Sequence, residues 1–434
     1  MLTRPRLRER YGTDVNIRSR ETRNEEVQIE HDGNIAFLKS NLKSLDKNKN
    51  KPKRGVTLVP SVTLNYSKLL RDIEVPEAFR ERYILTGYRP RNLTALECAR
   101  SVFHANNETV NFWSHFLSGL LLIARYCYVV WYHNPLSDHF YYPLTSFTLG
   151  CFTLYTMSCL AHMFSSMTER EFHIGYYLDY AAISVYTFTA GQAFYFYCHP
   201  IKSGLLLYDW RELFLFLSAL ISFGATYSCC MSRHHWLHLR FIIRTGSYIV
   251  SWVHNCSPYF VRQLNCSSDP FCNPDSFPIF IGCFLSFATA ALANMTRVPE
   301  RFFPGAFDLI GQSHHFLHVM TTLGDHFAYS VFLSDLEARK GALTLEHIPA
   351  FTETIGLTLL VLAGNLGIVF WFAKSLRLTS SGIHGTKKYR HANWLALPGR
   401  EDCLTQGCKH YGEYFEQKWS KKNSILGRGR GKSA

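Results

Sequence analysis

The sequence predicts an all-α membrane protein, a polytopic bundle of transmembrane helices. Three observations support this fold class. The chain is 47% hydrophobic and only 18% charged. Its apolar residues gather in long runs between residues 107 and 373, and the flanking regions 1–74 and 374–434 are polar and basic. Because a bilayer-spanning helix requires about 20 predominantly apolar residues, these runs are long enough to cross a membrane.

The bundle region contains eight such apolar segments. The second, fourth, sixth and eighth carry few ionisable side chains. The first, fifth and seventh carry more, among them Arg125, Arg244 and Asp325, and charged side chains at membrane depth usually face the interior of the bundle. The segments are residues 112–132, 143–164, 176–198, 212–231, 239–257, 277–296, 307–333 and 352–373.

The regions outside the bundle are expected to lie on one side of the membrane, because an even number of spans returns the chain to its starting side. Residues 1–74 are predicted to be a disordered tail and residues 374–434 a second basic tail. Residues 75–106 are partly amphipathic and predict an interfacial helix and turn, with Pro90 ending one local element. The start of the chain has no apolar h-region, so no cleaved signal peptide is expected.

The formal net charge of +13 resides largely in the two tails. Since Lys and Arg concentrate on the cytosolic side of membrane proteins, both termini are predicted to be cytosolic, with the plasma membrane as the expected location. Basic stretches such as residues 46–54 are expected to contact anionic membrane lipids and to offer sites for cytosolic signalling proteins. Charge that lies beside membrane spans favours lipid over nucleic acid, and no nucleic-acid partner is predicted.

The thirteen cysteines form neither a zinc-finger nor a CxxC pattern. Most lie inside apolar segments, where cysteine is commonly a small buried residue. Cys198, Cys256, Cys266 and Cys272 lie in or near predicted outer loops, so some of them are candidates for disulfide bonds on an oxidising face. The sequence does not decide between a disulfide and free thiols.

Five polar residues interrupt the apolar segments. Ser158 and His162 share one helix face in the second segment, as do His314 and His318 in the seventh, because each pair is spaced i, i+4. Asp179 lies near the start of the third segment. With alternating segment directions, all five are expected at a similar depth in the inner half of the membrane, and this convergence indicates a functional site.

The three histidines predict a zinc site. A catalytic zinc typically has three protein ligands and a water molecule, and His162, His314 and His318 supply three. The ion would bring the pKa of that water to about 7. Asp179 is the candidate to hold or deprotonate the water, and Ser158 the candidate to support the metal site or a developing oxyanion. The alternative is that each histidine is a hydrogen-bonded core residue.

Other polar residues are candidates to line a cavity. Glu108, Asn111 and His115 form a stripe at i, i+3, i+7 entering the first segment; this pattern equally fits a hydrogen-bonded helix start. Arg125 lies too far from either end of its segment to reach water, so a bundle-facing ion pair or a cavity role is expected. His315 points about 100° away from His314 and is excluded from the metal ligands.

A further histidine cluster lies in a predicted loop between the fourth and fifth segments. His234, His235 and His238 are flanked there by Arg233 and Arg240. Such a cluster of basic and titratable residues is typical of a solvated loop.

Three blocks of residues resemble the progestin and adipoQ receptor family, which belongs to a wider superfamily that includes alkaline ceramidases. The first block is Asn107-Glu-Thr-Val-Asn-Phe-Trp-Ser-His115, similar to the family's N-E-x-x-N-x-W-x-H. The second is Ser158-Cys-Leu-Ala-His162 followed by Leu178-Asp-Tyr180, and the third is Gly311-Gln-Ser-His-His-Phe-Leu-His318. The similarity spans about residues 75–373, and the blocks are specific as an ordered set.

The resemblance implies a seven-helix core, with the eighth segment added, and a zinc ion bound by His162, His314 and His318 with Asp179 on its water. Gly87-Tyr-Arg-Pro90, Arg125 and the eighth segment resemble the progestin branch. The implied function is a receptor for a steroid (progestin-like) or other lipid ligand. Two alternatives stay open: a ceramidase-like zinc hydrolase that releases fatty acid and sphingoid base, and a membrane scaffold with structural zinc.

Overall fold

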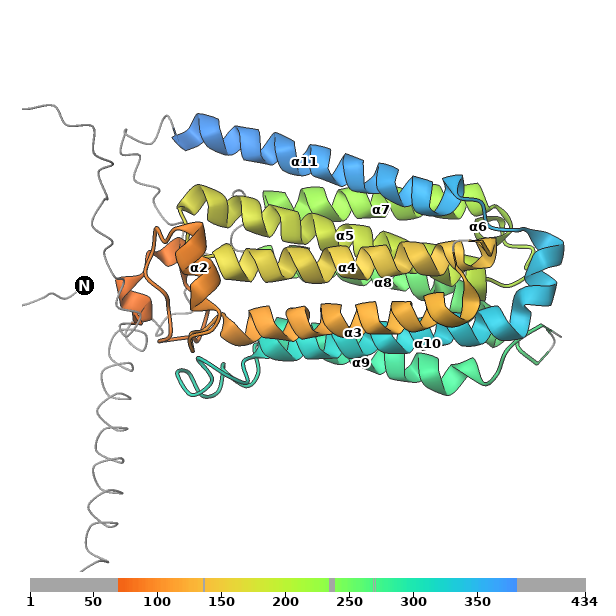
Figure 1. Cartoon of the computed structure of the whole chain (residues 1–434), viewed down its shortest axis with the longest axis horizontal. Helices are drawn as coiled ribbons and strands as arrows, with labels where there is room; N and C mark the ends of the chain where they lie inside the picture. The colour runs from red at the N-terminus through yellow and green to blue at the C-terminus, as the bar shows by residue number, and fades with distance from the viewer. Residues whose placement is uncertain (1–68, 136, 234–238, 268, 270, 381–434) are drawn as a thin grey trace, which may run out of the picture. The chain divides into compact units, whose positions relative to one another are not determined.

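In the part of the chain that the structure describes, eight long helices run side by side and form a bundle (Figure 1). The computed structural model describes residues 69–135, 137–233, 239–267, 269 and 271–380. Most of the two tails, residues 1–68 and 381–434, and His234, His235 and His238 lie outside the described residues. The long helices are α3 (Thr109–His133), α4 (Tyr142–Phe164), α5 (Glu169–Cys198), α7 (Arg211–Met231), α8 (Arg240–Leu264), α9 (Ser276–Thr296), α10 (Ser313–Glu346) and α11 (Leu357–Ser380).

Short elements connect the long helices. The segment before α3 contains η1 (Asp72–Glu74), η2 (Glu77–Phe79) and α2 (Ala95–Ser101). The turn η3 (His139–Tyr141) leads into α4, the single helical turn α6 (Leu206–Asp209) leads into α7, and the π-helical turn η4 (Thr352–Gly356) leads into α11. Within the described residues there is no β-strand, only an isolated bridge between Leu70 and Tyr88.

The predicted fold class is confirmed: the protein is an all-α polytopic membrane bundle. Five helices are long and apolar enough to cross a bilayer, namely α3, α4, α7, α9 and α11 with its preceding turn. The other three, α5, α8 and α10, correspond to the third, fifth and seventh predicted segments. These three contain more polar residues, which neighbouring helices can shield from lipid inside a bundle.

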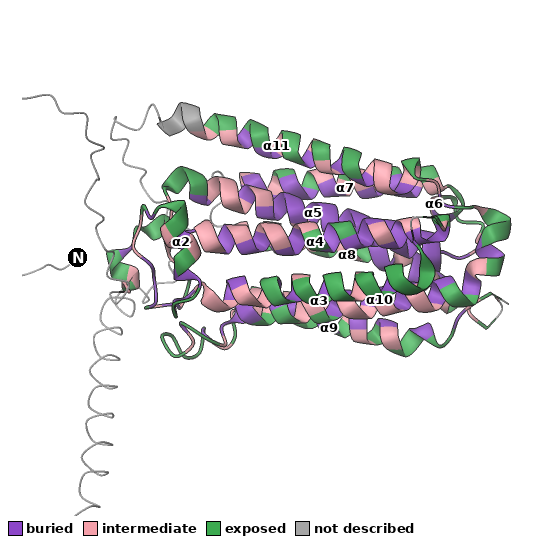
Figure 2. Ribbon diagram, in the orientation of Figure 1, coloured by how far each residue is buried: buried purple, intermediate pink, exposed green. Residues whose placement is uncertain are grey.

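Helix α5 occupies the centre of the bundle, with α4, α7, α8 and α11 packed around it. Every residue from Ser184 to Cys198 is buried, and Figure 2 shows the contrast with the more exposed α3. Gly191 permits the close approach of α8, because a Cβ at this position would overlap the Asn255 side chain. A helix that is buried on all sides fits this central place.

Two ends of the bundle can be distinguished. At one end, called here the histidine end, lie the start of α3, the end of α4 and the start of α10. At the opposite end, a fully buried ion pair joins α8 to α10, with 2.6 Å between Arg262 Nη1 and Asp335 Oδ2. Close to it, Cys266 and Cys272 form a disulfide, whereas Cys198 and Cys256 are free and buried. The pairing that the sequence left open is therefore Cys266–Cys272.

Residues 75–106, for which an interfacial helix and turn are expected, contain short turns and one helix. The helix is the seven-residue α2, which Thr94 and Glu97 cap reciprocally. Its place at a membrane interface stays a prediction. Gly87 adopts a φ of +87°, a conformation that glycine accommodates without steric cost. With Pro90 three residues later, the chain has no uninterrupted stretch for a longer helix.

The seventh segment also begins later than predicted. Residues 307–312 are not helical, and α10 starts at Ser313. Asp308, which the prediction placed inside the membrane segment, accepts hydrogen bonds from the backbone amides of Leu85 (3.1 Å) and Thr86 (2.7 Å). The loop before α10 is thus tied to the segment that precedes α3.

Candidate metal centre

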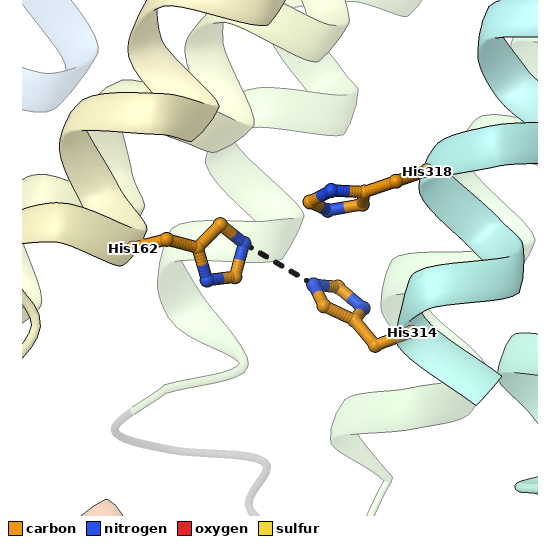
Figure 3. Close-up of side chains that lie close together, drawn as sticks. All are labelled: His162, His314 and His318. Carbon is orange, nitrogen blue, oxygen red and sulfur yellow. Dashed lines mark hydrogen bonds between the residues drawn. The ribbon is translucent and has the colours of Figure 1, made fainter. Parts of the chain in front are cut away.

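Three histidine side chains converge at the histidine end of the bundle (Figure 3). His162 comes from the last turns of α4, and His314 and His318 from the first turns of α10. One ring nitrogen from each lies within 4.8 Å of the others. The Nε2 atoms of His162 and His314 are 3.3 Å apart, which equals the separation of about 3.3 Å expected for two nitrogens that each lie about 2.0–2.1 Å from a tetrahedral zinc ion.

Hydrogen bonds orient two of these rings. The Nδ1 atom of His162 lies 2.7 Å from Glu108 Oε2. The Nδ1 atom of His318 lies 3.1 Å from the Asn111 carbonyl oxygen and 2.9 Å from Ser114 Oγ. A ring nitrogen that faces a carboxylate or carbonyl carries the proton, so Nε2 keeps the lone pair of each neutral ring. Both side chains therefore have the tautomer that a metal ligand requires, and the donor set fits zinc.

Glu108 has a role that the sequence did not reveal. It was predicted as a cavity-lining residue, yet its Oε2 atom accepts hydrogen bonds from both His162 and Asn111, the latter at 2.8 Å from Nδ2. The spacing of Glu108 and Asn111 indicated a shared helix face. The partner on α4 could not be identified from that spacing, because it depends on how α3 packs against α4.

Replacing Glu108 with glutamine is expected to weaken zinc binding about 10–100-fold, because carboxylates that orient a metal-binding histidine contribute about this much to affinity. Zinc affinity would be measured by competition with a chelator on detergent-purified protein. Glu337→Gln, an exposed position on α10, serves as the control. Equal affinity in the wild type and Glu108→Gln would show that this contact does not support a metal.

Asp179 and Ser158 line the same cavity as the three histidines. Both are buried, with 9% and 2% of their surface exposed. Among the described residues, Asp179 Oδ1 has no hydrogen-bond partner. A buried carboxylate oxygen without a protein partner is uncommon, and here it belongs to a residue that lines the cavity.

The cavity has a volume of about 1950 Å³, larger than the roughly 300–1,000 Å³ of ordinary small-molecule sites. The chemical type of the lining side chains differs between parts of the cavity. Arginine side chains lie at the histidine end, the histidines follow, and the remaining wall is largely apolar. That part includes Ile183, Phe194, Trp252 and Phe287. A cavity of this shape suits an amphipathic molecule such as a lipid.

The four cavity candidates of the first segment divide into two groups. Glu108, Asn111 and His115 lie on the cavity wall. His115 stacks on His318 with ring centroids 3.7 Å apart, and within the described residues neither of its ring nitrogens has a hydrogen-bond partner. Arg125 does not line this cavity, which corrects the prediction.

Arg125 instead bridges α3 and α10. It donates hydrogen bonds to the carbonyl oxygen of His326 and the hydroxyl of Ser330, both at 2.8 Å, and lies over the ring of Tyr329. Its Nη1 atom also lies 3.2 Å from His326 Nδ1, and none of these partners is a carboxylate. The expected ion pair is therefore absent from the described residues.

Arg89, in the sequence Gly87-Tyr-Arg-Pro90, fixes the end of α4. Its buried guanidinium donates to the carbonyl oxygens of His162 (2.7 Å) and Met163 (2.9 Å). It also donates to the hydroxyls of Ser101 and Ser165, both at 2.7 Å. Burial lowers the pKa of Arg89, and the nearby Glu108 carboxylate opposes this shift. The segment before α3 thereby holds the backbone of a candidate metal ligand in place.

The three histidines of the predicted basic loop after α7 lie outside the described residues, so the solvated loop stays a prediction, and only its flanking arginines are described. Arg233 and Arg240 both line the cavity, and Arg233 donates a hydrogen bond to the Tyr180 hydroxyl at 2.9 Å. The neighbouring His315 is not part of the histidine triad; its Nδ1 accepts the Gly311 amide proton at 3.0 Å.

Comparison with known proteins gives consistent results. The haemolysin-III related family matches residues 103–329. The chain is 32% identical over 326 residues to membrane progestin receptor delta of Homo sapiens. The aligned residues are 73% of this chain and 93% of that protein. The Mus musculus membrane progestin receptor delta is 33% identical over 328 residues, with the same coverage. The Danio rerio membrane progestin receptor gamma-B is 29% identical over 329 residues, which are 71% of this chain and 94% of the relative.

Proposed function

The chain belongs to the haemolysin-III related family, the progestin and adipoQ receptor family, and from this membership we propose that it is a multi-pass membrane receptor for a steroid, progestin-like, or other lipid ligand. The proposal includes a zinc ion held by His162, His314 and His318. One observation carries it: a single large cavity connects the histidine triad to an apolar interior. The names of the relatives support a steroid as the ligand class.

In this proposal, different residues hold the metal, orient its histidine ligands and bury the ligand body. His162, His314 and His318 would hold the zinc ion, which would act there as a Lewis acid toward an oxygen atom of the ligand. Glu108 and the Asn111 carbonyl keep His162 and His318 in the required tautomer. The apolar wall excludes water from the apolar body of the ligand. Burial of that body contributes a favourable binding free energy of about 25 cal/mol for each Å² of apolar surface removed from water.

Filling the cavity tests the receptor proposal. Ala291 on α9 lines the cavity, and its neighbour Leu292 is 62% exposed on the outside of the bundle. Ala291→Trp is expected to weaken progesterone binding at least about tenfold, because forcing extra side-chain volume into an occupied site costs about 1–3 kcal/mol. Leu292→Trp, with the same bulky residue facing outward, is the matched control.

Saturation binding of radiolabelled progesterone to both purified variants and the wild type is the measurement. An Ala291→Trp protein that binds progesterone as tightly as the wild type would place the ligand elsewhere. If the wild type binds no progesterone in a saturable manner, the steroid assignment fails.

A second function has an observation of its own, the position of the buried Asp179 carboxylate on the cavity wall. In a lipid amide hydrolase, the Asp179 carboxylate would accept a proton from the attacking water. The Ser158 hydroxyl, one helical turn before His162, would donate to the developing oxyanion. The products would be a fatty acid and a sphingoid base, as in ceramide hydrolysis.

We also propose that both termini are cytosolic and that the protein lies in the plasma membrane. Eight spans and the basic tails support this orientation. Epitope tags placed before Met1 and after Ala434 are expected to be detected on cells only after permeabilisation, with a tag in the Cys266–Cys272 loop as the surface-exposed control. Detection of the C-terminal tag on intact cells would mean an odd number of spans.

A further inference from the structure

Seven arginines line the cavity. Arg80 and Arg170 are two of them, and the other five are called here the arginine cluster. These five come from four separate parts of the chain: the segment before α3, the chain just after α7, the first two turns of α8 and the end of α9. The cluster comprises Arg82, Arg233, Arg240, Arg244 and Arg297.

Three members of the cluster surround one aromatic ring. The guanidinium carbons of Arg82, Arg240 and Arg297 lie 5.1, 4.9 and 4.6 Å from the centroid of the Phe241 ring. Phe241 itself lines the cavity. A guanidinium that places its flat face on an aromatic ring still presents its N–H groups at the edge. Phe241 therefore holds several donor groups together without neutralising their charge.

The cluster makes few direct ion pairs within the described residues. Among these, only Arg297 lies within 4.0 Å of a carboxylate oxygen, that of Glu81 at 3.7 Å, and the Nε atom of Arg297 is buried without a hydrogen-bond partner. Five carboxylates also line the cavity, namely Glu77, Glu81, Glu108, Glu169 and Asp179. Against seven arginines, they leave an excess of positive charge on the cavity wall.

The other two members, Arg233 and Arg244, donate hydrogen bonds to neighbouring side chains. Arg233 donates to His173 Nδ1 at 3.2 Å and to Tyr180, and Arg244 donates to Ser232 Oγ at 2.9 Å; these acceptors are uncharged. Arg82 is exposed and Arg240 half-buried, and each places its guanidinium against the Phe241 ring. Guanidinium groups whose contacts are mostly uncharged favour an anionic ligand at a cavity opening, because hydrogen bonds between ions are the strong ones.

We propose that the arginine cluster binds the anionic group of an amphipathic lipid whose apolar body occupies the cavity. The group is a sulfate, phosphate or carboxylate. This inference rests on the proposed function and narrows its ligand to a charged one. Continuity of the cluster with the apolar wall at Trp252 and Phe287 favours a lipid over a free inorganic anion, because a free anion would leave that wall in contact with water.

A steroid and its sulfate ester test the proposal, because they share one apolar body and differ in charge. Purified protein in a neutral detergent would be titrated with pregnenolone and with pregnenolone sulfate. We expect the wild type to bind the ester at least about tenfold more tightly, and added salt to reduce the difference through charge screening. In Arg240→Gln/Arg297→Gln the preference should disappear, while pregnenolone binding stays within about twofold of the wild type.

Two further double variants separate charge from folding. Arg240→Lys/Arg297→Lys keeps both charges and is expected to retain most of the preference for the ester. Arg100→Gln/Arg301→Gln removes two exposed arginines that do not line the cavity and is expected to behave as the wild type. Loss of the preference in this control, or its persistence in Arg240→Gln/Arg297→Gln, would overturn the assignment to the cluster.

The same titrations distinguish this inference from the proposed function. Saturable binding of both steroids with equal affinity would overturn the anionic class and leave the receptor proposal intact. No saturable binding of either steroid would overturn both. Inorganic sulfate that displaces pregnenolone sulfate at comparable concentrations would show that no lipid body is needed, and would overturn the lipid part of the inference.

Discussion

Replacing His314 and His318 together with alanine is expected to reduce the bound zinc from about one ion per chain to a trace. Three nitrogen ligands are the usual protein contribution to an open zinc site, and one remaining histidine cannot hold the ion. Because a metal that binds only the folded state stabilises that state, the midpoint of thermal unfolding should fall by several degrees. Elemental analysis of detergent-purified protein, with a parallel melting curve, measures both effects.

The adjacent histidine on α10 provides the control. His315 lies outside the triad, so His315→Ala should retain the zinc and its response to chelators. A chelator should also lower the melting midpoint of the wild type, with no effect on the double variant. Zinc content that is undiminished in His314→Ala/His318→Ala would disprove the assignment.

Replacing Asp179 with asparagine is expected to separate hydrolysis from ligand binding. If the wild type hydrolyses a ceramide-like amide, the variant should lose about 10²–10⁴-fold in rate, because a positioned general base contributes about this much. The variant should keep its zinc, since Asp179 is not among the three clustered ligands. Progesterone affinity should change little, because the change removes charge from one carboxylate and leaves the apolar wall intact.

Amide turnover, zinc content and progesterone binding are therefore measured on the same preparations. Asp275→Asn, an exposed position at the opposite end of the bundle, controls for the loss of a carboxylate. Turnover that is equal in wild type and Asp179→Asn would reject the hydrolytic role of Asp179. Saturable steroid binding by a wild type without any turnover would favour the receptor alone.

Much of this architecture could be predicted because it depends on local sequence. Apolar length located eight helices, and i, i+4 spacing identified His314 and His318 as neighbours on one helix face. The depth of His162 followed from the alternating direction of the spans. These inferences need only helical periodicity and the thickness of a bilayer.

The features that sequence reasoning missed depend on packing between distant segments. Glu108 and His162 are 54 residues apart in sequence, and no periodic pattern relates them. The apolar residues of 307–312 resembled the start of a span, yet Asp308 is satisfied by the backbone of residues 85 and 86. In the sequence, nothing distinguishes Arg240 and Arg297 from other basic residues near helix ends. In the structure, both contact the Phe241 ring and line one cavity.

Arg89 has a consequence for where this protein's functional unit begins. The residues matched by the family start at 103, but the guanidinium that holds the His162 carbonyl lies upstream of them. Leu70 pairs with Tyr88, directly beside Arg89. The smallest piece of this chain that contains a complete histidine site is therefore expected to extend back beyond the family match, to about residue 70.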